Sequence, residues 1–284
     1  MPNPLHVANG HCTTHLIEAA GLPGKTSIWA DALYEGPVPN VSDDALVRVR
    51  AEFIADGLDV SPDDVEADLK RWRAVVDNDD GYDELALWFE HDLFDQLNLI
   101  QLLTRIGRDR PIRKPASLIS IDRYPGHPDF KGLGELSPPD IAALFGARQP
   151  VSSRQFSLAT AAWDAFRSGS RQHLEAVLQA DTSALPFLAA ALRRHLDETA
   201  TAPSGLTLSE RRLIEQLAHG PVDIHTAFIA MHQGETAYYI TDSSFWAMVS
   251  RLAARSPALI DVAVTEQPTT ARPSLPSGTL SLRQ

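Results

Sequence analysis

Residues 84–106 read ELALWFEHDLFDQLNLIQLLTRI, and the pattern of this stretch changes in its middle. The segment from Leu85 to Phe89 is an uninterrupted apolar run, which is typical of a buried strand. After Glu90, His91 and Asp92 the apolar residues recur at helical spacing. The stretch therefore predicts a strand, a turn with three ionisable side chains, and a helix. Open α/β sheets bind ligands at such turns, outside the carboxyl ends of their strands.

The same alternation of strand and helix extends over residues 5–121 and predicts an α/β fold with a small parallel, Rossmann/flavodoxin-like sheet. In the flavodoxin-like strand order 2-1-3-4 the winding reverses between the first and third strands, which would make the loops at Asn9 and Glu90 neighbours. The other predicted strands are 5–8, 25–30 and 116–121, and the predicted helices before the central strand are 13–20, 43–56 and 62–77.

Beyond residue 136 helices follow one another without strands, so we expect the chain to divide into further parts. Residues 1–136 are predicted to form an α/β ligand-binding domain and residues 137–204 a helical connector. Residues 205–264 are predicted to form a winged-helix-like module with a β-like piece at 237–240. Residues 265–284 are rich in Pro, Ser and Thr and poor in apolar groups, which predicts a disordered tail.

The charge balance argues against some partners. The formal net charge is −12, from 25 basic and 37 acidic residues, and residues 206–264 carry four basic and six acidic side chains. Phosphate backbones are repelled by such a balance, so DNA binding is not expected. The single cysteine excludes a disulfide framework, and no signal peptide or apolar run of membrane-spanning length is visible. We therefore expect a cytoplasmic protein that does not bind membranes.

Three stretches of the chain resemble an uncharacterised bacterial family, domain of unknown function 1835. They are HVANGHCTTHLIEAAGLPGKTSIWADALYEGPVP (6–39), LWFEHDLFDQLNLIQLL (87–103) and ISIDRYPGHPDFKGLGELSP (119–138). The module at 205–264 resembles the companion domain of unknown function 3658. The resemblance implies a bacterial protein with a two-part architecture, but it assigns no catalytic residues. Relatives commonly have Asp-Ser where this chain has His11-Cys12.

The loop after the first predicted strand contains a candidate ligand-binding group of five residues. A helix start with free backbone N–H groups and threonine hydroxyls can bind an anion, although a simple glycine turn with a threonine cap explains the same residues. The thiol in this group lies at a positive helix end and could be a nucleophile, or it could be inert. The residues are Asn9, Gly10, His11, Cys12 and Thr13.

The turn after the central strand contains the candidate catalytic residues Glu90, His91 and Asp92, with Asp95 one helical turn further on. They are candidates for acid–base chemistry or for binding a divalent metal, and an oxygen-rich set favours magnesium or manganese over zinc. A structural alternative explains Asp92 as a helix N-cap and pairs Glu90 with an arginine. The neighbouring loops offer three further ligands for a metal, His6, His11 and Asp122.

The loops after the second and fourth predicted strands add ligand-binding candidates. Asp31 and Glu35 follow the second strand, and Asp122 and His127 follow the fourth. The loop 122–135 is long and contains several glycines and prolines, which favours a lid over the site.

From these features we expect a protein that binds a small polar or phosphorylated ligand at the carboxyl ends of the strands, with hydrolysis or group transfer as the reactions that such a site supports. The alternative is a non-enzymatic regulatory protein that contacts a protein partner through its winged-helix-like module. The sequence identifies no cofactor, and it leaves open whether the protein is an enzyme.

Overall fold

The computed structural model describes residues 2–58, 60–199, 205–266 and 275–283. The chain forms two compact units, Met1–Leu192 and Arg193–Gln284, and each is described by itself. The first unit contains, in chain order, β1 (Pro4–Ala8), α1 (His11–Ala19), β2 (Lys25–Ile28), α2 (Asp43–Leu58), α3 (Pro62–Asp77), η1 (Asp79–Gly81), β3 (Glu84–Trp88), α4 (Leu93–Thr104), the π-helical turn η2 (Arg105–Asp109), β4 (Ala116–Ile119), η3 (Leu133–Glu135), α5 (Pro138–Gly146), β5 (Gln149–Pro150), α6 (Ser153–Arg167), α7 (Arg171–Gln179) and the start of α8 (Leu188–Thr199).

The first unit is built on a five-stranded sheet with the strand order β2-β1-β3-β4-β5. Strands β1 to β4 are parallel to one another, and β5 runs antiparallel beside β4. The predicted α/β fold and the flavodoxin-like strand order are therefore confirmed, with the winding reversed between β1 and β3. The two-residue β5 was not predicted. It contains a proline and lies at the sheet edge, where proline is tolerated.

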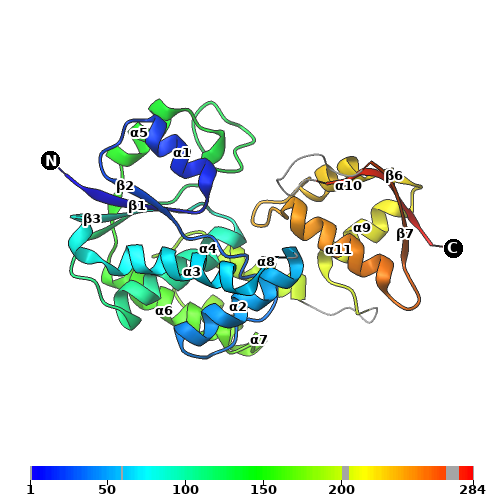
Figure 1. Ribbon diagram of the computed structural model, residues 1–284, viewed down its shortest axis with the longest axis horizontal. Helices are drawn as coiled ribbons and strands as arrows, with labels where there is room; N and C mark the ends of the chain where they lie inside the picture. Colours follow the sequence, from blue (N-terminus) through cyan, green and yellow to red (C-terminus); the bar gives the residue numbers. More distant parts are fainter. Residues whose placement is uncertain (1, 59, 200–204, 267–274, 284) are drawn as a thin grey trace. The chain divides into compact units, whose positions relative to one another are not determined.

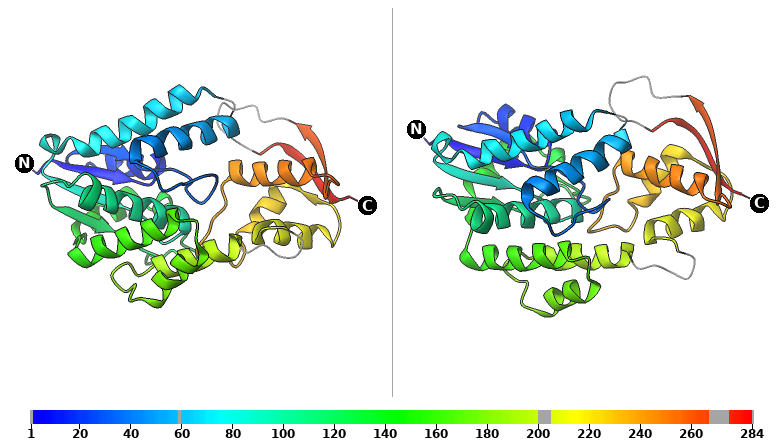
Figure 2. Two further views of the ribbon diagram at one scale, coloured as in Figure 1. Left: turned by 90° about the horizontal axis from the view of Figure 1, so that it is seen from below. Right: turned by 60° about the horizontal axis from the view of Figure 1, so that its bottom comes forward.

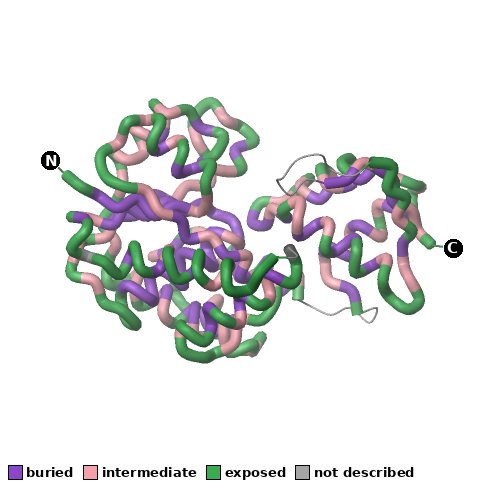
Figure 3. Tube along the Cα trace, in the orientation of Figure 1, coloured by how far each residue is buried: buried purple, intermediate pink, exposed green. Residues whose placement is uncertain are grey.

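Helices cover both faces of this sheet. Helices α1 and α5 lie on one face and α3, α4 and α6 on the other, as Figures 1 and 2 show. All five residues of β1 and four of the five in β3 are buried, because a parallel sheet covered on both faces has no solvent side. In Figure 3 the strands are accordingly buried, and much of the outer surface of α2 and α3 is exposed.

Helix α4 is the central helix of the first unit, with eleven of its twelve residues buried. A buried helix normally presents apolar side chains, yet Asp95, Asn98 and Gln101 recur every three residues along this one. The Asn98 amide donates to the Asp31 carbonyl oxygen at 2.8 Å and accepts from the Asp31 N–H at 3.0 Å, and the Gln101 Oε1 accepts from the Trp29 indole N–H at 2.8 Å. Two members of this polar row, Asn98 and Gln101, therefore hold the segment that follows β2.

The buried Arg50 of α2 completes the attachment of that segment. Its guanidinium donates to both carboxylate oxygens of Asp31, with a shortest distance of 2.6 Å, and to the carbonyl oxygens of Ala32, Glu35 and Pro37. A buried charge is stable only when it is paired and fully hydrogen-bonded. Residues 31–37 thus wrap around one arginine.

The second unit contains the end of α8 and six further elements in the order helix, strand, helix, helix, strand, strand. Its three-stranded sheet has the order β6-β8-β7, and both pairings are antiparallel. The winged-helix assignment of this unit stays a prediction. The elements are α9 (Leu208–Leu217), β6 (Val222–Asp223), α10 (Ile224–Met231), α11 (Asp242–Ala254), β7 (Ile260–Glu266) and β8 (Ser277–Leu282).

Three predictions about the chain beyond the sheet need correction. The tail is not disordered throughout, because residues 277–282 form β8, which pairs with β6 and β7 and buries Leu280 completely. The expected β-like piece at 237–240 is not a strand. The connector is not a separate layer, since α5, α6 and α7 belong to the first unit and α6 packs on α4. The predicted boundary at 200–204 lies outside the described residues.

Every helix in the described part of the chain is too short or too polar to cross a membrane.

Candidate metal centre

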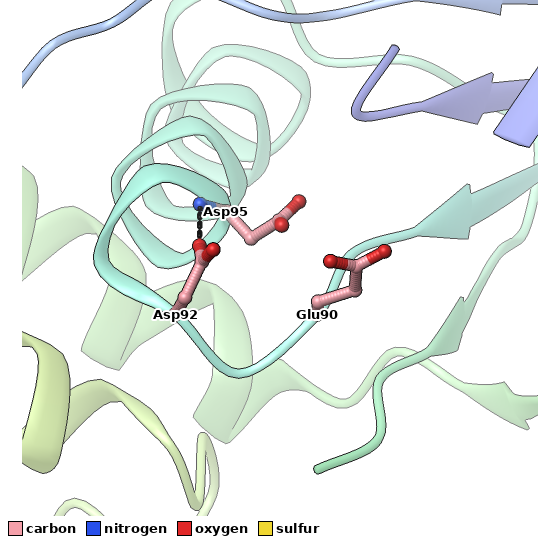
Figure 4. Close-up of side chains that lie close together, drawn as sticks. All are labelled: Glu90, Asp92 and Asp95. Atoms are coloured by element: carbon pink, nitrogen blue, oxygen red, sulfur yellow. Dashed lines mark hydrogen bonds between the residues drawn. The ribbon is translucent and has the colours of Figure 1, made fainter. Parts of the chain in front are cut away.

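Three carboxylates meet where β3 gives way to α4. One oxygen each of Glu90, Asp92 and Asp95 lies within 4.8 Å of the others. Figure 4 shows the side chains of Glu90 and Asp95 pointing toward each other from the loop and from the helix. Glu90 and Asp92 are each 7% exposed and Asp95 is 1% exposed. The cluster is therefore buried at the edge of the sheet where a ligand is expected.

The start of helix α4 positions two of these carboxylates. Asp92 is its N-cap, and the Asp92 Oδ1 accepts from the Asp95 N–H at 2.9 Å. A cap of this kind satisfies a backbone donor that has no partner within the helix. The Gln96 amide donates to the Glu90 carbonyl oxygen at 2.6 Å and so ties the first turn of the helix to the loop before it. The predicted capping role of Asp92 is confirmed.

The loop after β1 contributes Asn9. Its amide donates to the Asp95 Oδ2 at 3.0 Å, while its own Oδ1 accepts from the Thr13 hydroxyl at 2.8 Å. The Thr13 bond fixes which end of the Asn9 amide faces the carboxylate. The prediction that the Asn9 and Glu90 loops are neighbours is confirmed, and it follows from the reversal of winding between β1 and β3.

The loop after β4 covers Glu90. The Leu133 N–H donates to the Glu90 Oε1 at 2.5 Å, and a Cβ at Gly132 would lie only 2.6 Å from the Glu90 Oε2. A side chain at this position would therefore displace the Glu90 carboxylate. Phe130, Leu133 and Leu136 are buried in the core formed with α1 and α5, so the end of the loop is anchored in place. The sequence predicted a functional loop here but not the roles of Gly132 and Leu133, for which the glycine spacing in KGLGE was the available signal.

The negative charge of the cluster is not offset by an ion pair among the described residues. None of the ion pairs among the described residues includes Glu90, Asp92 or Asp95, so the predicted arginine partner of Glu90 is not found there. Burial and the nearby Asp92 raise the pKa of Glu90 to about 7. Burial raises the pKa of Asp92, and burial together with the charges of Glu90 and Asp92 raises that of Asp95 well above its ordinary value.

Two buried oxygen acceptors at the cluster have no hydrogen-bond donor within the described ranges. They are the Asp95 Oδ1 and the Gln96 Oε1, and the Gln96 amide lies directly beside Glu90. Buried polar atoms are nearly always satisfied, so an excess of acceptors without donors indicates a missing positive partner. A metal cation bound by oxygen atoms is such a partner.

The distances suit a hard divalent cation. Oxygen atoms on opposite sides of Mg²⁺ are separated by about 4.2 Å and those around Ca²⁺ by about 4.8 Å, from their usual bond lengths. At most one pair of the three oxygens can lie on opposite sides of an ion, so the cluster, whose oxygens lie within 4.8 Å of one another, must contract to ligate either ion. An all-oxygen set is less suited to zinc, which favours sulfur and nitrogen ligands.

His91 is not one of the three clustered ligands. It is buried, and its ring packs edge-on against that of Phe187 at 6.2 Å between centroids. A charge on this ring partly opposes the rise that burial causes in the pKa of Asp92, and it adds to the lowering of the pKa of Asp122. The main cause of the lowered Asp122 pKa is the Arg123 guanidinium, which donates to the Asp122 carboxylate at 2.9 Å. The His91 ring therefore lies close enough to Asp92 and Asp122 to influence the pKa of each carboxyl group.

The remaining candidates of the first and fourth loops are not members of the carboxylate cluster. Gly10 precedes the first residue of α1, and Cys12 is exposed with its Cβ 3.5 Å from a Cβ built at Gly134. His11 is also exposed. His127 packs against Tyr124 within its own loop. Ligand-binding roles for these residues stay predictions.

Asp31 and Glu35 have structural contacts in this fold. The Asp31 carboxylate is paired with the buried Arg50, and the Glu35 carbonyl oxygen accepts from the same guanidinium. Their predicted ligand-binding role stays untested. The polar residues that follow β2 are explained by the contacts that hold residues 31–37 to Arg50.

His6 is a structural histidine rather than a metal ligand. Its Nδ1 accepts from the Trp88 indole N–H at 3.1 Å, which leaves its Nε2 to donate to the Pro23 carbonyl oxygen at 2.9 Å. Both ring nitrogens are therefore engaged in the neutral form, and burial lowers the pKa of the ring.

Comparison with known proteins adds no assignment to this geometry. No protein-family model matches the chain, and no curated protein matches its sequence. The candidate centre therefore depends on its own residues.

Proposed function

We propose that the first unit binds a divalent cation, Mg²⁺ or Mn²⁺, between Glu90, Asp92 and Asp95. The observation that carries the proposal is the absence of an ion pair to any of three buried carboxylates in the described part of the chain, together with the donorless oxygen of Asp95. Burying ionised carboxylates without a partner is costly, and a cation removes that cost by neutralising them.

We further propose that the cation helps to hold a small phosphorylated or otherwise anionic ligand at the carboxyl ends of the strands. Magnesium is usually held by one or two carboxylates and completes its coordination with water and substrate phosphates. In this arrangement Asn9 orients Asp95, and His91 is the nearest candidate for proton transfer. Hydrolysis and group transfer of the bound ligand are the reactions that suit these parts.

Membership of the family called domain of unknown function 1835 and a cytoplasmic location are parts of the same proposal. The family is supported by the three long stretches at 6–39, 87–103 and 119–138, which supply the loops around the cluster. The location is supported by the single cysteine, which leaves no intrachain disulfide to form.

The experiment is a calorimetric titration of the EDTA-treated, dialysed protein with MgCl₂, MnCl₂, CaCl₂ and ZnCl₂. We expect one site for Mg²⁺ or Mn²⁺ in the natural chain and none in Asp95→Asn. The variant keeps an oxygen for the Asn9 amide, so its fold is preserved. Small phosphorylated compounds are then screened with and without the bound cation.

Absence of cation binding to the natural chain would contradict the proposal. The three carboxylates would then share protons, and the interaction protein acting through the second unit would become the better hypothesis.

A further inference from the structure

A second polar site lies near the carboxyl end of α4, in a cavity of about 250 Å³. Its walls are the start of α2, the π-helical turn η2 and the last turn of α6. Gln101 lies six residues beyond Asp95 on α4, which is about 9 Å along a helix axis. The cavity is therefore distinct from the carboxylate cluster. Basic side chains gather in its wall: Arg105, Arg108, Arg110 and Arg167.

Two buried N–H donors that line this cavity have no acceptor in the described part of the chain. One is the Gln101 Nε2, on a residue that is 3% exposed, and the other is the Arg167 Nε. The Gln101 amide cannot be flipped, because its Oε1 accepts the indole N–H of Trp29. Arg167 is likewise fixed, since its terminal nitrogens donate to Asn40 and Val41. Both donors therefore need an acceptor that the described residues do not supply.

The charged side chains around the cavity indicate the chemical class of that acceptor. Arg105 is paired with Asp43 and Asp77, and Arg108 with Asp109 and Asp164. A terminal nitrogen of Arg167 also lies 4.0 Å from the Asp164 carboxylate. The cavity wall itself carries four arginines and three aspartates, which leaves one formal positive charge. Arg110 is in no ion pair among the described residues, and its charge remains available.

The start of α2 adds positive potential from the backbone. Asp43 and Asp44 are the first residues of this 16-residue helix, and N–H groups in a first turn have no partner within the helix. The Ala45 N–H is capped by the Ser42 hydroxyl at 3.4 Å. The positive end of the helix dipole favours an anion there. The exposed Asp44 side chain and the paired Asp43 oppose this, so the anion must also be recognised by Gln101, Arg110 and Arg167.

We propose that this cavity binds an oxyanion, specifically the phosphate group of inorganic phosphate or of a small phosphomonoester, and that it does so without a divalent cation. Phosphate oxygens accept several N–H bonds at once, which matches two fixed donors and one free guanidinium. The proposal is independent of the cation site, because it rests on a different part of α4.

The test is a titration of the full-length, EDTA-treated protein with sodium phosphate and with glycerol 3-phosphate, at constant ionic strength kept with NaCl. We expect saturable binding of phosphate, seen by calorimetry and by a rise in melting temperature. Tighter binding of glycerol 3-phosphate would assign the site to a phosphomonoester, and equal or weaker binding would assign it to the free ion.

Three variants locate the binding. Gln101→Glu keeps an acceptor for Trp29 but replaces the donor by a carboxylate, and Arg110→Gln removes the exposed charge; we expect each to weaken phosphate binding about tenfold or more. Arg154→Gln removes an exposed arginine at the far end of α6 and should leave the affinity unchanged. Asp95→Asn should also leave it unchanged, which separates this site from the cation site.

The proposal is overturned if phosphate stabilises the protein no more than NaCl of equal ionic strength, because the two donors would then be hydrated by water. It is equally overturned if phosphate binds but the exposed variant Arg110→Gln, whose folding is verified by its melting curve, binds as tightly as the natural chain.

Discussion

Glu90 links the candidate site to the stability of the whole first unit. Burial and Asp92 raise its pKa from the ordinary 4.5 to about 7, so at intermediate pH the folded chain keeps a proton that the unfolded chain has lost. The folded state is therefore favoured below pH 4.5, and this contribution is lost as the pH rises through about 7. We expect Glu90→Gln to stabilise the metal-free protein at pH 8 by up to about 3 kcal/mol.

Urea denaturation in EDTA at pH 5 and pH 8 measures this difference. The gain from Glu90→Gln should be larger at pH 8, because the glutamine stays neutral there. Glu52→Gln, at an exposed position on α2, is the matched control and should change little at either pH. A loss of stability in Glu90→Gln at pH 8 would show that the ionised Glu90 has a partner in the folded protein.

Gly132 is needed because the backbone passes directly over the Glu90 carboxylate. A Cβ at this position would lie 2.6 Å from the Glu90 Oε2, whereas one at Gly134 would have its nearest neighbour at 3.5 Å. We expect Gly132→Ala to cost about 1–3 kcal/mol through overpacking and to weaken cation binding by displacing Glu90. Gly134→Ala should be close to neutral. Equal melting curves for the two variants would contradict the close approach.

The three carboxylates of the cluster were predictable from the local sequence, but the contact of the loop after β4 with Glu90 was not. Glu90, Asp92 and Asp95 are close in the chain, and the strand-to-helix pattern places them at one turn. Asn9 followed from the strand order. Gly132 and Leu133 reach Glu90 from more than forty residues away, and a glycine pattern alone does not say which side chain it accommodates.

Among the elements, the polar row of α4 and Arg50 of α2 show why a polar strand end need not be a binding site. Asp31 follows β2 as Glu90 follows β3, but its carboxylate neutralises a fully buried arginine. We expect Asp31→Ala to destabilise the protein by about 3–5 kcal/mol, since it leaves that charge without a partner, and to leave the affinity for the cation unchanged.

Asp122→Ala is the matched comparison, because Asp122 is also an acidic residue after a strand and pairs with an arginine that is 85% exposed. Its removal should cost no more than about 1 kcal/mol. Denaturation curves and a cation titration on both variants check the two expectations. If Asp31→Ala folded normally but bound no cation, Asp31 would belong to the site after all.

The elements themselves were predicted well where apolar runs were long. The strands and helices between residues 5 and 121 lie within a few residues of their predicted ranges, because buried parallel strands are nearly continuous apolar runs. The two-residue strands β5 and β6 were missed, since such short segments have no periodicity. β8 was missed because its Ser- and Thr-rich sequence resembles a linker, and its pairing with β7 supplies the stability that composition does not show.

For the whole molecule, net charge predicts which macromolecules are excluded. The chain has a formal charge of −12, and α11, the helix that would read DNA in a winged helix, contains Arg251 as its one basic residue. Since phosphate contacts supply most non-specific affinity, we expect negligible binding to random duplex DNA at physiological salt. Fluorescence anisotropy measures this directly. Submicromolar affinity with a steep salt dependence would contradict it.

The division into two units was only partly visible in the sequence. The change from strand–helix alternation to consecutive helices suggested a boundary near residue 137, but α5 and α6 complete the cover of the sheet and belong to the first unit. Periodicity identifies helices, whereas the partner that buries an apolar face depends on contacts between distant segments.

The most direct test of the cation centre is the anomalous scattering of Mn²⁺ in crystals of the natural chain grown with millimolar MnCl₂. The proposed site predicts one strong anomalous peak between Glu90, Asp92 and Asp95, about 2.0–2.3 Å from an oxygen of each, and no such peak in crystals of Asp95→Asn. Crystals of the natural chain that show no peak there, with the three carboxyl groups hydrogen-bonded to one another, would contradict it.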